Sequence, residues 1–103
     1  MVVEDLIKDC KSGGDAYHLL REFYEELFEE VFAEEYKSGN MLFSSNEEEL
    51  YYKMGNGVVN TMVNYLDQYL FLVKVENLNE ICRSIIRARK DCYNYKYKQK
   101  KEI

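Results

Sequence analysis

The segment from Asp15 to Lys37 constrains the fold most, because its apolar residues recur at the spacing of one helix face. At about 100° per residue, eight apolar side chains fall within half the circumference. They are Tyr17, Leu20, Phe23, Tyr24, Leu27, Phe28, Val31 and Phe32. The other half holds Glu22, Glu25, Glu26 and Glu29. The pattern predicts a long amphipathic helix that buries one side, with Asp15 as its N-cap.

Shorter patterns on both sides of this segment predict further helices. One helix runs from about residue 2 to residue 11 and ends at the glycine pair 13–14, since glycine adopts left-handed conformations at little cost. Another begins at the capping box formed by Ser45 and Glu48. It reaches the Gly-Asn-Gly sequence at 55–57, where we expect a break or a kink.

Beyond this break the apolar stripe resumes and carries the prediction to the end of the chain. Its members are Val58, Val59, Met62, Tyr65, Leu66, Tyr69, Leu70 and Val73. The last helix begins at Asn77, and its stripe fails after Tyr93. Proline, which interrupts helices, is absent. The sequence therefore predicts an all-α fold, a compact four- or five-helix bundle with short loops at 1–93 and a basic, Tyr/Lys-rich tail at 94–103.

One segment leaves a second fold class open. The residues from Tyr69 to Val75 also have the aromatic and β-branched composition of a strand. The segment from Met41 to Phe43 is a candidate to pair with it. An α+β fold is the alternative to the bundle.

Length and composition bound the class of protein. A chain of 103 residues forms one domain with a single core. No run approaches the roughly 18 apolar residues of a membrane span. The three cysteines lack CxxC spacing and no signal peptide opens the chain, so we expect a cytoplasmic protein with reduced thiols and no membrane contact. Frequent Lys, Asn, Tyr, Ile and Glu suggest a microbial or viral source.

Residues of catalytic and metal-binding type do not form a recognisable set. His18 is the only histidine and shares a helix face with glutamates, so we expect a solvated surface residue. Di-metal carboxylate sites in bundles need two inward-pointing Glu-x-x-His units, and zinc needs four Cys or His ligands. Cys10, Cys82 and Cys92 lie in apolar stripes, where a thiol packs as a small hydrophobe. We expect no enzyme activity, no cofactor and no metal site.

The back of the segment 58–75 is the first candidate binding surface. Only Asp67 and Lys74 carry charge in this segment, whereas other outward faces of the chain are heavily charged. A face depleted in charge that holds an aromatic residue is typical of a protein interface or of a central position in a bundle. Both readings stay open for the five residues opposite the stripe, which are Asn60, Thr61, Asn64, Gln68 and Phe71.

The basic C-terminal part is the second candidate. The net charge is −5, but sixteen acidic and six basic residues precede Asn77, and three acidic and eight basic residues follow. Cations interleaved with tyrosines can hold phosphates and stack on bases. The candidates are Arg83, Arg87, Lys90, Lys96, Lys98, Lys100 and Lys101. Alternatively, the cations pair with the acidic second helix of their own bundle or of a second copy. Arg89 lies within the apolar stripe, so it must snorkel or meet a carboxylate.

These patterns favour a non-catalytic protein–protein interaction subunit or adaptor that self-associates as a homodimer. The alternative is a small nucleic-acid-binding protein that acts through its basic C-terminal helix and tail. A third possibility is an acidic inhibitor whose glutamate face competes with nucleic acid for a basic protein.

Overall fold

The computed structural model describes residues 1–38 and 47–102, without the side chains of 47, 67, 68 and 91–102. The elements are α1 (Val3–Ile7), α2 (Gly13–Lys37), α3 (Glu47–Asn60), the π-helix η1 (Thr61–Tyr65), α4 (Asp67–Leu70), the 3-10 helix η2 (Val75–Asn77) and α5 (Leu78–Glu102). Within these ranges no strand occurs, and the all-α prediction is confirmed.

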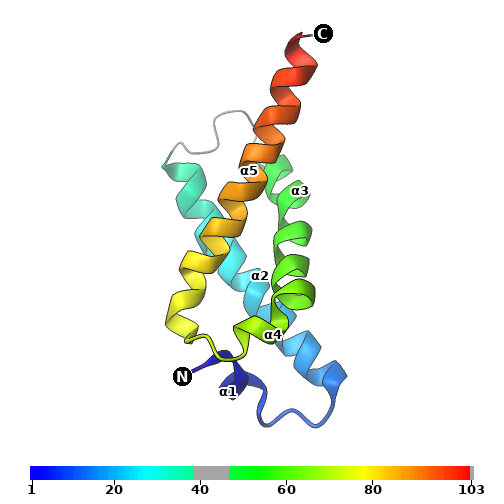
Figure 1. The fold of residues 1–103 in the computed structure, drawn as a ribbon, viewed down its shortest axis with the longest axis vertical. Coiled ribbons are helices and arrows are strands. Elements are labelled where there is room, and N and C mark those ends of the chain that lie inside the picture. Colours follow the sequence, from blue (N-terminus) through cyan, green and yellow to red (C-terminus); the bar gives the residue numbers. More distant parts are fainter. Residues whose placement is uncertain (39–46, 103) are drawn as a thin grey trace.

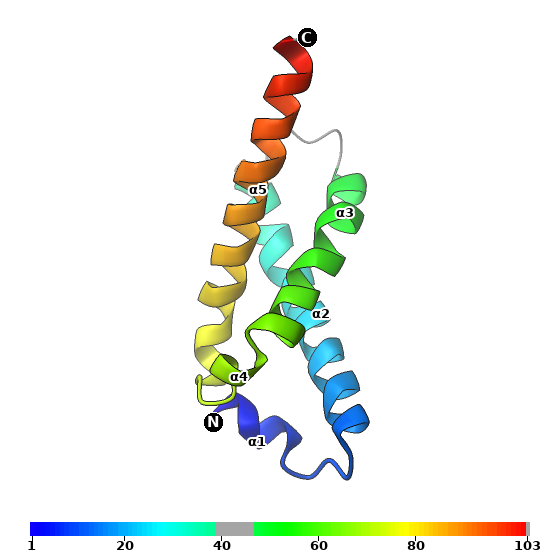
Figure 2. The same ribbon diagram turned by 45° about the vertical axis from the view of Figure 1, so that its right-hand side comes forward.

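Three long helices, α2, α3 and α5, lie side by side, and α1 and α4 lie at one end of them (Figure 1; Figure 2). The molecule measures 52 × 23 × 22 Å. It is elongated because α5 continues beyond the ends of α2 and α3, so the two termini lie at opposite ends (Figure 1). Among the described residues, no helix combines the length and the apolar character that a membrane crossing requires.

The first helices begin and end at other residues than the sequence predicted. The N-cap of α2 is Ser12, whose hydroxyl accepts a hydrogen bond from the backbone N–H of Asp15 at 3.1 Å. Asp15, the predicted cap, therefore lies inside the first turn, where a carboxylate interacts favourably with the helix dipole. The first helix ends at Ile7 instead of continuing to Lys11.

The predicted apolar face of α2 supplies much of the core. Six of its eight residues are buried: Leu20, Tyr24, Leu27, Phe28, Val31 and Phe32. Phe23 is half-buried and Tyr17 is exposed. The ring of Phe28 packs with its centroid 5.3 Å from those of Phe32 and Tyr51. This cluster joins α2 to α3.

The glycines at 55 and 57 do not break α3, so that prediction is wrong. Instead they let two side chains of other helices approach its backbone. A Cβ atom at Gly55 would lie 3.2 Å from the ring of Phe28, and one at Gly57 would lie 2.5 Å from the guanidinium of Arg89. A glycine in a helix interior lowers the free energy of unfolding by about 1 kcal/mol relative to alanine. A close contact with another side chain can offset this loss.

The predicted apolar stripe of residues 58–73 is interrupted by η1. The N–H of Leu66 donates to the carbonyl of Thr61 at 3.1 Å, the wide bond of a π-helix. The wide turn shifts the phase of the following residues, and Tyr65 and Tyr69, predicted to be buried, are each 76% exposed.

After α4 the chain turns and runs beside the N-terminus. The segment predicted as a possible strand forms only an isolated antiparallel bridge between Val2 and Lys74. Its suggested partner at Met41–Phe43 lies outside the described residues. Ser45, which the sequence predicted to form a capping box with Glu48, also lies outside the described residues.

The last helix starts at Leu78, one residue after the predicted start, because residues 75–77 form a 3-10 turn. Its predicted stripe faces the core at Leu78, Cys82 and Ile86, all of which are fully buried. The backbone is helical through Glu102, so the segment 94–102 continues α5. The division of the chain at residue 93 stays a prediction.

The packing around Phe28 predicts a large difference between two aromatic positions. Phe28→Ala should lower the free energy of unfolding by about 3–5 kcal/mol, because it removes a buried ring that contacts two others. Tyr52→Ala, at a residue that is 69% exposed, should change it by no more than about 0.5 kcal/mol. Urea unfolding measures both values. Comparable losses for the two variants would show that this core is wrongly assigned.

Candidate interaction surfaces

Glu35 of α2 is an acidic residue buried against α5, with 3% of its surface exposed. Arg87 donates to both of its carboxylate oxygens, from Nε to Oε2 at 3.2 Å and from Nη2 to Oε1 at 3.1 Å. The Nε atom of Arg83 lies 3.1 Å from Oε1. A buried carboxylate without such partners would be very costly, so both arginines hold α5 against α2.

Arg83 also reaches two further carboxylates. Its Nη2 lies 2.7 Å from Oε2 of Glu34, and its Nη1 pairs with Glu80 one turn earlier on α5. Desolvation lowers the pKa of Arg83, but the hydrogen bond to Glu34 and the charges of Glu80, Glu34 and Glu35 raise it, and the net shift is upward. The guanidinium is thus surrounded by acidic groups of its own chain.

Two of the predicted nucleic-acid-binding cations are therefore engaged within the bundle. For Arg83 and Arg87, the structure shows the alternative in which the basic helix pairs with the acidic helix of the same chain. Lys90 is half-buried. The remaining candidates lie on the C-terminal part of α5, where only the backbone is described. These are Lys96, Lys98, Lys100 and Lys101.

Glu35 itself was missed by the sequence reasoning, although a signal was present. It follows Phe28 by seven residues, which places it on the buried side of α2. Arg83 and Arg87 are spaced by four residues on one face of α5. A carboxylate on the buried side of one helix, together with two cations four residues apart on another helix, indicates a buried ion pair.

The predicted partner face is partly used inside the molecule. Asn60 accepts a hydrogen bond from Nη1 of Arg21 at 2.7 Å. The hydroxyl of Thr61 donates to the carbonyl of Gly57 at 2.7 Å and accepts from Nη2 of Arg89 at 3.2 Å. These two residues therefore join η1 and the end of α3 to α2 and α5.

The other three residues of that face lie in different surroundings. Asn64 is exposed. Phe71 is half-buried and packs against the core. The side chain of Gln68 lies outside the described residues. The four described members thus do not form one exposed face.

Arg89 occupies space that Gly57 leaves open. A Cβ atom at residue 57 would lie 2.5 Å from Nη1 and 2.7 Å from Cζ of this arginine. The sequence predicted that Arg89 would snorkel or pair with a carboxylate. Its described hydrogen-bond partner is instead the hydroxyl of Thr61.

Three exposed apolar side chains, missed from the sequence, lie in α4 and directly on both sides of it: Tyr65, Tyr69 and Leu72, each 76% exposed. We call these three residues together the tyrosine–leucine surface. Sequence periodicity placed both tyrosines in the buried stripe. No residue pattern predicted the π-helix η1, which turns both side chains outward. Met1 is also exposed, at 70%, and its carbonyl accepts a hydrogen bond from the N–H of Val75.

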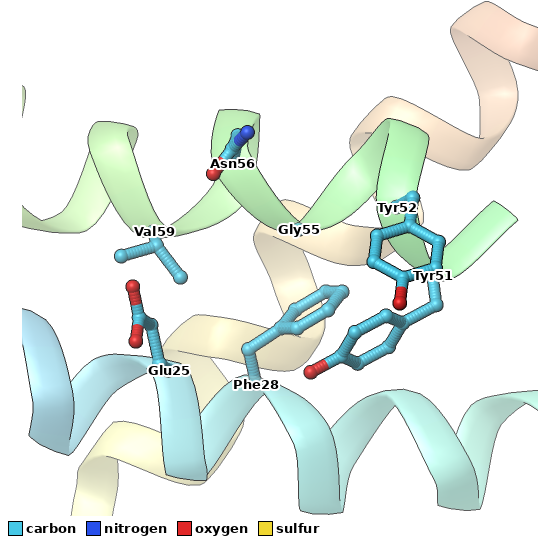
Figure 3. A pocket seen from close by; sticks show the side chains of 7 residues that line it. All are labelled: Glu25, Phe28, Tyr51, Tyr52, Gly55, Asn56 and Val59. Atoms are coloured by element: carbon cyan, nitrogen blue, oxygen red, sulfur yellow. The ribbon is translucent and has the colours of Figure 1, made fainter. Parts of the chain in front are cut away.

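A small pocket of about 200 Å³ lies between α2 and α3 (Figure 3). Gly55 and six side chains line this α2–α3 pocket: Glu25, Phe28, Tyr51, Tyr52, Asn56 and Val59. Burial raises the pKa of Tyr51, and the negative charges of Glu29 and Glu25 raise it further. The pocket thus combines aromatic walls with nearby carboxylates. The sequence predicted that the glutamates of α2 face solvent and that Phe28 faces the core, and it made no prediction for Tyr51 and Tyr52, so the pocket was missed.

The residues considered for chemistry lie apart from one another. Cys82 is fully buried, and burial raises the pKa of its thiol to about 12 against the opposing charge of Arg83. His18 is exposed, with the ring of Tyr17 edge-on to it. The core position of Cys82 and the surface position of His18 are confirmed, and Cys92 lies outside the described side chains. No group of three or more His, Cys, Asp or Glu residues is placed to hold a metal within the described part.

No family model, curated protein or solved structure matches this chain. Its function is therefore inferred from the contacts of its own residues.

The contact between Gly57 and Arg89 predicts that the effect of Gly57→Ala on stability depends on whether Arg89 is present. In an Arg89→Ala background, Gly57→Ala should raise the free energy of unfolding by about 1 kcal/mol, the helix preference of alanine over glycine. In the wild-type background the methyl group displaces the guanidinium from Thr61, so we expect no gain or a loss. Chemical denaturation of the four proteins measures both effects. Equal effects in the two backgrounds would contradict the assignment.

Proposed function

We propose that the chain is a non-catalytic protein–protein interaction subunit that self-associates through the tyrosine–leucine surface. The observation that supports this is the 76% exposure of Tyr65, Tyr69 and Leu72 within eight residues. Exposed apolar residues on a monomer are normally scattered singly, and groups of them mark interaction sites. Tyrosine is also enriched in the cores of protein interfaces.

The backbone under this surface is well fixed. The N–H of Val3 donates to the carbonyl of Val73, the N–H of Glu4 to that of Phe71, and the N–H of Val75 to that of Met1, each at 2.9 Å. Leu70 is buried at 3% exposure, and Phe71 and Val73 pack against the core. A preorganised surface loses less conformational entropy when a partner binds, which favours stable association.

A second copy of the chain suits the surface because its three side chains carry no charge. In a two-fold symmetric dimer the same surface of both subunits meets, so a charged surface would face its own charge. The exposed faces of α2 and the C-terminal part of α5 are, in contrast, rich in charge of one sign. Self-association is therefore expected at the α4 end.

Nucleic-acid binding through the end of α5 is the second candidate. It is supported by the path of this helix, which extends past α2 and α3 and carries four lysines away from the glutamates of α2 (Figure 1). It ranks second because Arg83 and Arg87 pair with Glu35 and Glu34. The inhibitor hypothesis, based on the glutamate face of α2, gains no further support.

Light scattering after size-exclusion chromatography tests self-association. We expect a homodimer at micromolar concentration, and Tyr69→Glu and Leu72→Glu should each give a folded monomer, since burying a carboxylate at an apolar contact is costly. Tyr52→Glu is the matched control, because Tyr52 is also highly exposed but lies near the start of α3. Phe71→Glu is expected to destabilise the fold itself, because Phe71 packs against the core. A wild-type chain that stays monomeric at high concentration, or dissociation by Tyr52→Glu, would refute the proposal.

A further inference from the structure

The α2–α3 pocket has the composition of a cation-binding site. We infer that it binds an organic ammonium ion whose nitrogen carries alkyl groups, such as a methylated amine. The pocket shares no residue with the tyrosine–leucine surface, so this inference goes beyond the proposed function and stands independently of it.

Three aromatic rings form one end of the pocket. The centroids of Tyr51 and Tyr52 are 5.8 Å apart with ring planes at 81°, so the two rings form a corner. Phe28 lies beside them, 5.3 Å from Tyr51 (Figure 3). A cation within about 6 Å of a ring centroid is attracted to the negative face of the ring. Rings in different orientations around one small space can make this contact from several sides.

The charges around the pocket also favour a cation. Glu25 lies at the end opposite the two tyrosines (Figure 3). One of its oxygens lies 3.2 Å from Nε of Arg21, and its side chain remains 53% exposed. Glu29, one turn later on α2, is exposed, and both charges act on Tyr51 in the direction that holds its proton. Two carboxylates of α2 thus lie near the rings, and Glu29 is the one that does not share its charge with Arg21.

Size and hydrogen-bonding capacity indicate an alkylated head group. About 200 Å³ is below the roughly 300–1,000 Å³ of sites for drug-sized ligands, so the space suits a single head group. An unalkylated ammonium is strongly hydrated and has three N–H donors to satisfy. The polar side chains of the pocket, Glu25 and Asn56, lie away from the rings of Tyr51 and Tyr52, which offer no acceptor on their faces. An alkylated ammonium, which has fewer or no N–H groups to satisfy, therefore suits the aromatic end better.

Gly55 and Tyr52 lie at different depths in the pocket. A side chain at residue 55 would contact Phe28, since its Cβ atom would lie 3.2 Å from Cε1 of that ring. The absence of a side chain therefore lets the ring pack against the backbone of α3. Tyr52 is 69% exposed, whereas Phe28 is 1% exposed, so the former faces solvent and the latter lies at the inner wall.

Choline and its uncharged analogue 3,3-dimethylbutan-1-ol test the inference, because they share a shape and differ in charge. The full chain is titrated with each, and binding is followed by NMR at the Gly55 amide and the ring protons of Phe28 and Tyr51. We expect choline to bind in the millimolar range and the analogue at least about fivefold more weakly, as a desolvated cation–π contact implies. A trimethyllysine amide forms the second arm. If it binds more tightly than choline, the source is a protein side chain, and the reverse order indicates a free small molecule.

Variants of Tyr52 separate a ring contact from other effects. Tyr52→Ala should weaken choline binding at least about fivefold, and Tyr52→Phe should retain it, because the face of the ring makes the contact. Leu19→Ala, at an exposed apolar residue of α2 outside both the pocket and the tyrosine–leucine surface, should leave binding unchanged. Far-UV circular dichroism checks that each variant is folded. Equal affinity for choline and its analogue, no choline binding, or full binding by Tyr52→Ala would overturn the inference.

Discussion

Glu35 places a carboxylate between α2 and α5 at a position where only 3% of the residue is exposed. Such a group remains ionised in the interior only when cations and hydrogen bonds replace its water. Arg83 and Arg87, one turn apart on α5, both reach it. Their positions fix how α5 is rotated and shifted along α2, and with this rotation Cys82 and Ile86 face the core. The placement of α5 thus depends on this ion pair.

Arginines perform a similar task elsewhere in the bundle. Arg21 of α2 bonds to Asn60, and Arg89 of α5 bonds to Thr61 across the bare backbone at Gly57. The first contact joins α2 to the end of α3, and the second joins α5 to η1, each through a polar group that is half-buried. Four arginines of the chain, Arg21, Arg83, Arg87 and Arg89, thus make contacts between helices, and two of them were nucleic-acid candidates from the sequence. Among the described residues, the tyrosine–leucine surface and the α2–α3 pocket remain open to solvent.

Much of the fold could be predicted from the sequence, because the apolar period of α2 is sustained over its whole length and burial follows it. The helical stretch through Gly55 and Gly57 could not, since each glycine is explained by a side chain distant in sequence, Phe28 or Arg89. The exposure of Tyr65 could not be predicted either. The sequence analysis assigned this residue to the core because it assumed an uninterrupted helix, whereas η1 changes which residues face the core. Periodicity identifies the apolar face of a helix, whereas contacts between distant segments decide which residues of that face pack in the core.

A double-mutant cycle between Glu35 and Arg87 tests most directly whether these cations serve the bundle. Urea unfolding of the wild type, Glu35→Ala, Arg87→Ala and the double variant gives the coupling free energy of the pair. A buried carboxylate that accepts two hydrogen bonds from one guanidinium predicts a coupling of about 1 kcal/mol or more. Effects that add to within about 0.3–0.5 kcal/mol would show that the two residues act independently and that Arg87 is free for another role.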